Sequence, residues 1–190
     1  MKVSGPLLPA FTAEGLLPPG DYVLSLEELA RSPLVLGPAD LDEVACWDRD
    51  WRGRLVENLG VLVRQLWQVG VEDVFIDGSF VEDKDHPNDI DGYFVCDLTR
   101  LASGELQREL NLLDPHKVWT WDLASRRPFR GYPKRQLPMW HVYRVELYPH
   151  YGQLCGLRDE QGHELEFPSA FRRSRRDGRA RGIVKIEGRS

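Results

Sequence analysis

The sequence predicts an α+β fold, a small mixed β-sheet flanked by helices. The first observation is a long amphipathic helix pattern at about 48–69, followed by an apolar strand pattern from Val74 to Asp77. The second is a polar loop and another strand pattern, Ile90 to Val95, so that helix, strand, turn and strand follow in close succession. A length of 190 residues suits one domain, 1–190, with a sizeable core.

The two ends of the chain differ from its middle. Residues 1–24 are apolar but interrupted by proline and glycine, which favours an extended N-terminal arm. Residues 170–190 form a basic C-terminal segment with eight of the 25 Lys and Arg and two of the 30 Asp and Glu. This segment is therefore near +6 and the rest of the chain near −11. Two readings are open: it contacts nucleic acid or phosphate, or it lies against its own acidic body.

The cysteines and the hydropathy pattern indicate a compartment. Cys46, Cys96 and Cys155 lie far apart and lack the paired spacing of a zinc site. Such cysteines fit a reducing compartment without structural disulfides. The sequence has no apolar run of membrane-spanning length, and its N-terminus lacks the pattern of a secretion signal. We therefore expect a cytoplasmic protein with no membrane partner.

Capping signals and periodicity place the helices. Ser25 and Glu28 have the spacing of a capping box, which predicts a short helix to about Arg31. The helix at 48–69 has one apolar stripe and ends at Gly70. A further helix is predicted near 104–113.

The second half of the chain adds strands and a loop. The residues from 124 to 138 carry five basic side chains and three prolines, which predicts a long basic loop. Alternating patterns predict strands at 118–121 and 139–148, and shorter strand candidates at 154–157 and 183–186.

The candidate site lies around the first two strands. Gly78 permits a backbone conformation or a close approach that a side chain would forbid, and Ser79 supplies a hydroxyl where the strand ends. Asp89 and Asp91 are two residues apart, so both carboxylates leave one face of an extended strand. Glu146 is an acid between apolar neighbours in a later predicted strand, and it needs a cationic or metal partner if buried. Carboxylates beside a small-residue turn can hold phosphates and their magnesium ions.

These motifs resemble the signature of the nucleotidyltransferase superfamily related to DNA polymerase beta. The matching pattern is an apolar strand, Gly78-Ser79, nine intervening residues and Asp89-Ile-Asp91, with Glu146 as the candidate third acid. Gly92 departs from the pattern, because an apolar residue usually follows the second acid. Over nearly its whole length the chain looks like an uncharacterised family of short bacterial and phage proteins classed only as nucleotidyltransferase-like.

The resemblance implies a nucleotidyltransferase fold and a magnesium-dependent enzyme. Such an enzyme would move a nucleoside monophosphate from an NTP, ATP first among them, to a hydroxyl of a protein, an RNA or a small molecule. Asp89 and Asp91 would hold two Mg²⁺ ions, and Glu146 would complete the metal site or take the acceptor's proton. Ser79 and Gly78 would hold the distal phosphates, and Lys84 and Arg144 are further candidate nucleotide-binding residues, with Arg144 alternatively pairing with an acid. Without the other motifs, a simpler interpretation of Asp89-x-Asp91 would be that Asn88-Asp89 caps a turn and that Asp91 is exposed to solvent.

A non-catalytic binding module is the alternative. Some small members of the superfamily are antitoxins that transfer AMP onto a partner toxin, and others modify tRNA or small molecules. By analogy, this chain would take a toxin-antitoxin role with a protein partner, or act as a nucleic-acid adaptor that binds RNA through the basic loop and the C-terminal segment.

Overall fold

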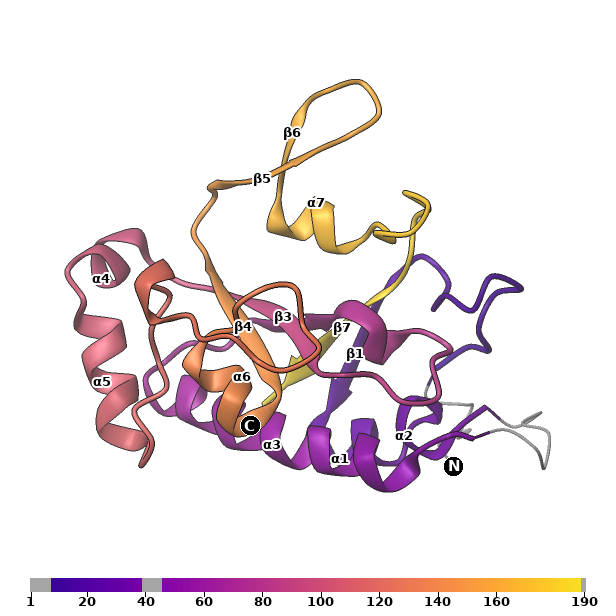
Figure 1. Ribbon diagram of the computed structural model, residues 1–190, viewed down its shortest axis with the longest axis horizontal. Helices are drawn as coiled ribbons and strands as arrows, with labels where there is room; N and C mark the ends of the chain where they lie inside the picture. The colour runs from indigo at the N-terminus through magenta and orange to yellow at the C-terminus, as the bar shows by residue number, and fades with distance from the viewer. Residues whose placement is uncertain (1–7, 39–45, 189–190) are drawn as a thin grey trace, which may run out of the picture.

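The computed structural model describes residues 8–38 and 46–188, and its centre is a five-stranded sheet (Figure 1). The spatial order of the strands is β1-β7-β2-β3-β4. β1 is parallel to β7 and β3 is parallel to β4, whereas β2 is antiparallel to both β7 and β3. The sheet is therefore mixed, and the predicted α+β class is confirmed. The strands are β1 Asp21–Ser25, β2 Val74–Asp77, β3 Ile90–Val95, β4 Val145–His150 and β7 Ile183–Glu187.

One long helix, α3 Arg49–Gln68, lies along one face of this sheet (Figure 1). It begins where the Asp48 side chain accepts a hydrogen bond from the Trp51 backbone N–H at 2.9 Å. Its apolar stripe is buried, as the periodicity predicted. The predicted capping box is confirmed at Ser25 and Glu28. The other helices are α1 Leu26–Ala30, α2 Pro33–Leu36, α4 Leu98–Ala102, α5 Glu105–Leu113, α6 Pro138–Tyr143 and α7 Phe167–Phe171.

The two faces of the central sheet pack against two different apolar clusters. Val74, Ile76 and Leu147 belong to the main apolar core, which includes the stripe of α3. Alternate residues point to the opposite face, where Tyr93 and Ile183 pack with residues of α7 in a smaller apolar cluster. A separate two-stranded sheet, β5 Leu154–Arg158 with β6 Glu164–Glu166, lies on this second side with α7 (Figure 1).

Two strand predictions are wrong. Residues 139–143 of the predicted strand 139–148 lie in α6, because Pro138 at the first turn favours a helix start. Arg144 then ends the helix in a left-handed conformation, with φ of 56°, and only residues from Val145 onward form β4. Residues 118–121 join no strand either. Instead, the Asn111 side chain pairs with the backbone of Trp119, donating to its C=O at 2.8 Å and accepting from its N–H at 3.0 Å.

Both ends of the described chain enter the central sheet. The final residues of the predicted N-terminal arm form β1, and the basic C-terminal segment supplies β7, its parallel neighbour. Leu8, Leu16 and Leu17 of the arm are buried, while residues 1–7 lie outside the described residues. Within the described residues, no helix has both the length and the apolar character needed to cross a membrane.

Candidate functional site

Strand pairing brings the predicted acids together. Asp91 on β3 lies opposite Glu146 on β4, and it also lies opposite Asp77 at the end of β2. Residues paired in this way share one face of a sheet, here the face turned away from α3. Asp89 directly precedes β3. Its charge raises the pKa of Asp91, and the charge of Glu146 raises the pKa of both aspartates, so the three predicted acids form one electrostatic cluster.

The surroundings of Asp89 and Asp91 disfavour the ionised form of both carboxyl groups. Burial, and then the charge of Asp89, raises the pKa of Asp91 to about 7. Burial also raises the pKa of Asp89, although the Trp140 indole N–H donates to its carboxylate at 2.7 Å and acts the other way. Trp140 was not among the residues that the sequence motifs singled out. A cation between the two carboxylates would relieve their repulsion.

Glu146 is buried and hydrogen-bonded on both of its oxygens. One oxygen accepts from the Leu137 backbone N–H at 2.8 Å, and the other accepts from the Tyr148 hydroxyl. Arg126 in turn donates to the Tyr148 oxygen at 3.1 Å. Glu146 therefore connects the acidic cluster to the loop that precedes α6.

The Gly-Ser turn is in contact with the second aspartate. Gly78 opens a 3₁₀ helix, Gly78–Val81, directly after β2, and its φ is +78°. A Cβ at this position would lie 2.9 Å from Oδ2 of Asp91. Glycine is thus required both by the left-handed conformation and by the close approach. Both reasons that the sequence suggested for a glycine at position 78, a special backbone conformation and a close approach, are therefore present in the structure.

A cavity of about 500 Å³ opens beside this turn. Asp91, Gly78 and Ser79 line it, whereas Asp89 and Glu146 are not among its lining residues. The remaining lining residues are mostly charged; they are Asp77, Glu82, Asp83, Lys84, Phe171, Arg175, Arg176 and Arg181. Asp91 therefore lies between the cavity and the other two predicted acids.

The two predicted nucleotide-binding cations, Lys84 and Arg144, lie in different surroundings in the structure. Lys84 is exposed, lines the cavity and lowers the pKa of Asp89. Arg144 does not line the cavity: its guanidinium carbon lies 3.9 Å from the ring centroid of Trp140 and 4.3 Å from that of Phe129. Like Lys84, Arg144 lowers the pKa of Asp89. The structure thus places Lys84 beside the Gly-Ser turn and Arg144 among aromatic rings.

A buried ion cluster in the wall of the cavity was missed from the sequence. Arg181 pairs with Asp77 at 2.5 Å and with Glu82. All three side chains are nearly or fully buried. A possible signal was Asp77, an acid at the end of an apolar strand and directly before the Gly-Ser turn. Its partner lies 104 positions away, so local patterns could not identify the pair.

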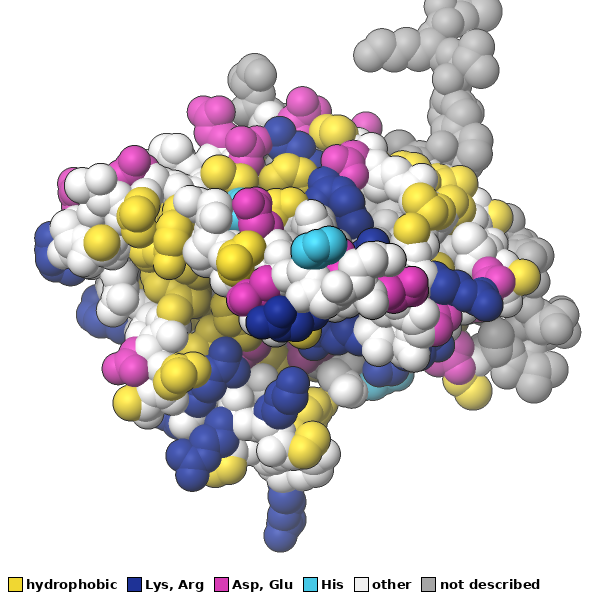
Figure 2. Space-filling model, turned by 90° about the horizontal axis from the view of Figure 1, so that it is seen from above, with side chains coloured by type: hydrophobic (Ala, Val, Ile, Leu, Met, Phe, Trp, Pro, Cys, Tyr) yellow, Lys and Arg dark blue, Asp and Glu magenta, His cyan; other side chains and the backbone are white. Residues whose placement is uncertain are grey.

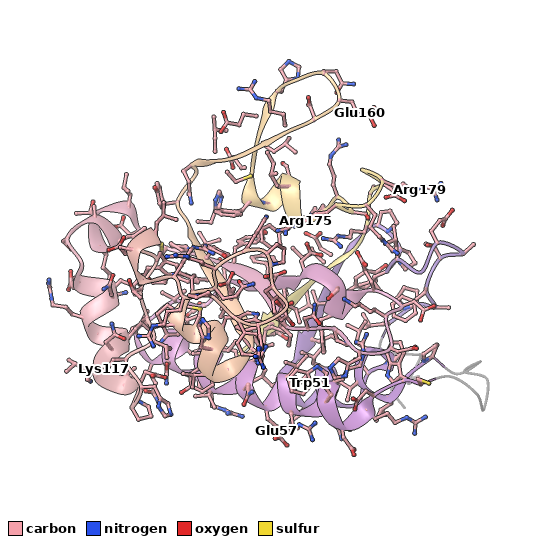
Figure 3. The ribbon with its side chains drawn as sticks, viewed as in Figure 1. Trp51, Glu57, Lys117, Glu160, Arg175 and Arg179 are labelled. Atoms are coloured by element: carbon pink, nitrogen blue, oxygen red, sulfur yellow. The ribbon has the colours of Figure 1, made fainter. Side chains whose placement is uncertain are left out.

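The basic C-terminal segment lies largely against the acidic body. Five of its cations form ion pairs, which join Arg172 to Asp21, Arg176 to Glu82, Arg179 to Glu14, Arg181 to Asp77 and Lys185 to Asp73. Arg175 also lines the cavity and lowers the pKa of Asp91, but within the described residues it forms no ion pair. Figure 3 shows it on the side of the sheet where α7 lies.

Comparison with known proteins gives a family. A model of DUF6932, a family of unknown function, matches residues 9–187. The chain belongs to the DUF6932 family. No curated protein and no solved structure matches it.

The acids of this DUF6932 chain fit magnesium bound by one or two carboxylates, rather than by three protein ligands. Among the described residues, no group of three His, Cys, Asp or Glu side chains is arranged to hold one metal ion. Magnesium in phosphate-transfer sites commonly takes only one or two carboxylates and completes its shell with water and phosphate oxygens. Asp89 and Asp91 suit that mode, since burial raises the pKa of both carboxyls and the charge of Asp89 raises that of Asp91 further. Glu146 already uses both oxygens in hydrogen bonds.

Proposed function

We propose that this DUF6932 protein is a magnesium-dependent nucleotidyltransferase with a nucleotidyltransferase-like fold. It would transfer a nucleoside monophosphate from an NTP, with ATP as the first candidate, to an acceptor hydroxyl. The observation that carries the proposal is the contact between Gly78 and Asp91 at the edge of a cavity lined by both acids and cations. The turn lies beside the acids, as binding of a metal-nucleotide complex requires.

The cavity and the acids beside it would bind different parts of the nucleotide. Asp89 and Asp91 would hold two Mg²⁺ ions, which supply charge neutralisation at the transferring phosphate. Ser79 and the backbone of the turn would donate to the distal phosphates. Lys84 and Arg175, which line the same cavity, would neutralise the remaining phosphate charge.

The chemical step would be a substitution at the α-phosphorus. The acceptor oxygen forms a bond to phosphorus, the bond to the oxygen bridging the β-phosphate breaks, and pyrophosphate leaves. The acceptor's proton would pass to Glu146, whose oxygens each retain a second lone pair beside the hydrogen bond that they accept. Burial of the acids strengthens their interaction with cations.

Calorimetry with ATP and Mg²⁺ tests nucleotide binding. The double variant Asp89→Asn with Asp91→Asn keeps the size of both side chains but removes both charges. Glu57→Gln with Glu160→Gln is the matched control, since these exposed acids lie on α3 and in the β5–β6 hairpin, away from the cavity (Figure 3). We expect the site variant to lose magnesium-dependent binding and the control to keep it. Unchanged affinity in the site variant would refute the proposed metal site.

The acceptor class follows from a second experiment. Incubation of the protein with α-labelled ATP, cellular RNA and cellular protein would show which fraction retains the label. Release of pyrophosphate with labelling of any fraction supports the enzyme. ATP binding without pyrophosphate release and without labelling of any fraction supports a non-catalytic binding module instead.

That alternative is a non-catalytic binding module, such as an antitoxin. The engagement of Glu146 by the Leu137 backbone and Tyr148 favours it, because a proton acceptor held in this way also serves as a purely structural link. Recovery of one stable protein partner, unaffected by Asp89→Asn and Asp91→Asn, would support this role. A cytoplasmic location suits either function, since Cys96 and Cys155 carry free thiols.

A further inference from the structure

The basic loop, residues 126–137, has an unusual charge pattern. From 123 to 145 the chain contains six Lys and Arg and no Asp or Glu. Arg130, Lys134 and Arg135 are exposed, and within the described part of the chain none of these three takes part in an ion pair. The cations of the C-terminal segment, by contrast, are mostly paired with acids. The basic loop therefore presents positive charge that the protein itself leaves uncompensated.

This loop is held in place beside the acidic cluster. Arg127 and Gln136 exchange two backbone hydrogen bonds of 2.9 Å, and Arg126 donates to the Arg135 C=O at 3.0 Å. The loop ends at Leu137, whose N–H donates to Glu146. Its cations are thus presented on a shaped segment, and binding an anion there costs less conformational entropy than ordering a free loop.

Aromatic rings lie between the loop and the acids. Phe129 is 38% exposed, and its ring packs edge to face on Tyr132 and Trp140, with centroids 5.5 and 5.1 Å away. Arg144 stacks over Phe129 and Trp140. Trp140 then donates to Asp89, so the ring cluster is one hydrogen bond from the proposed metal site. In Figure 2, Lys and Arg side chains gather with hydrophobic side chains among them over the lower part of the view.

We propose that the basic loop binds single-stranded RNA and presents a ribose hydroxyl of that RNA as the acceptor. This inference rests on the proposed nucleotidyl transfer and names its acceptor. Unpaired cations bind backbone phosphates by releasing counterions, and an exposed aromatic ring stacks on unpaired bases. A duplex would hide its bases from Phe129. An RNA strand, unlike DNA, carries a hydroxyl on every ribose that crosses the acidic cluster.

Fluorescence anisotropy with a labelled 20-nucleotide single-stranded RNA of mixed sequence tests binding without turnover. The loop variant combines Arg130→Ala, Lys134→Ala and Arg135→Ala. The control variant removes the same charge from exposed positions of α3, with Arg49→Ala, Arg54→Ala and Arg64→Ala. At 0.15 M salt the loop variant should bind on the order of 50-fold more weakly, and its slope of log K against log salt should be smaller by about 2. The control should resemble the parent protein.

Further probes separate the possible sources of the signal. Single-stranded DNA should bind but accept no label beyond its terminus, and duplex RNA should bind more weakly than the single strand. Equal loss in the loop and control variants would overturn the loop assignment, as would RNA binding that the loop variant retains. Poly-glutamate that binds as tightly as RNA, with the same dependence on the loop, would overturn RNA in favour of an acidic protein.

The acceptor role is separable from the proposed function. With α-labelled ATP, the RNA should gain label in the parent protein and lose most of it in the loop variant. Label that reaches only protein, while RNA still binds, refutes the acceptor role but leaves nucleotidyl transfer standing. The Asp89→Asn, Asp91→Asn variant should still bind RNA through the loop cations while losing label transfer, so failure of catalysis would leave the binding result intact.

Discussion

Replacement of Arg181 by methionine should remove a large part of the protein's stability. Arg181 is 4% exposed, and its guanidinium bonds Asp77, Glu82 and the Phe171 C=O. Methionine has a similar length but no charge, so the variant removes the cation paired with buried Asp77 and leaves Glu82 with only its longer pair to Arg176. Breaking a buried ion pair from one side typically costs about 3–5 kcal/mol. Domains of this size are stable by roughly 5–15 kcal/mol, so the loss would be a substantial share.

Urea unfolding followed by tryptophan fluorescence measures this loss. With a slope of about 2 kcal/mol per molar urea, the midpoint of the Arg181→Met variant should fall by roughly 2 M. Adding Asp77→Asn and Glu82→Gln should recover most of that loss, since neutral amides need no cation. Arg158→Met is the control, because Arg158 and Glu164 form an exposed pair 4.0 Å apart, and the midpoint should hardly change.

Two results would contradict this reasoning. A midpoint for Arg181→Met within the error of the parent protein would mean that the cluster is solvated rather than buried. A triple variant no more stable than Arg181→Met would mean that packing of the arginine side chain, not its charge, supplies the stability.

Three further predictions concern the sheet and the acids. Gly92→Ala should destabilise the protein by about 2 kcal/mol, because a Cβ there would lie 2.3 Å from a backbone oxygen of β2. Gly53→Ala in α3 should stabilise it by about 0.5–1 kcal/mol, because a Cβ there would meet open space. Thermal unfolding of both variants measures the two effects. Trp140→Phe keeps a ring but removes the N–H bonded to Asp89, so calorimetry should show ATP binding with magnesium about tenfold weaker. The pKa of Asp91 is raised to about 7, so the folded state keeps a proton that the unfolded chain releases, and stability falls as pH rises from about 4 to 7. Relative to Asp91→Asn, the free energy of unfolding should fall by on the order of 1 kcal/mol per pH unit in that window, measured by urea titration at several pH values.

Gly92 shows how one local departure acquires a reason in three dimensions. By sequence it is an exception to the nucleotidyltransferase pattern, since an apolar residue usually follows the second acid. In the sheet, a side chain there would collide with the backbone of β2 and with Leu147 on β4. The exception is thus a packing requirement between neighbouring strands. No periodicity within β3 could have disclosed it.

The sequence by itself determined the elements whose causes are local. Caps and periodicity located α3, and apolar strand patterns located β2 and β3 with the Gly78-Ser79 turn between them. The Asp89-x-Asp91 spacing is local as well, because a strand's pleat directs alternate residues to one face.

Tertiary structure alone decided which distant groups meet. The pairing of Arg181 with Asp77, the hydrogen bonds that occupy Glu146 and the indole that holds Asp89 depend on strand order and loop path. The replacement of part of a predicted strand by α6 has a local cause instead, because Pro138 favours a helix start where alternation alone favoured a strand. Local patterns report what a segment prefers, whereas ion pairs and close contacts depend on segments far apart in the chain.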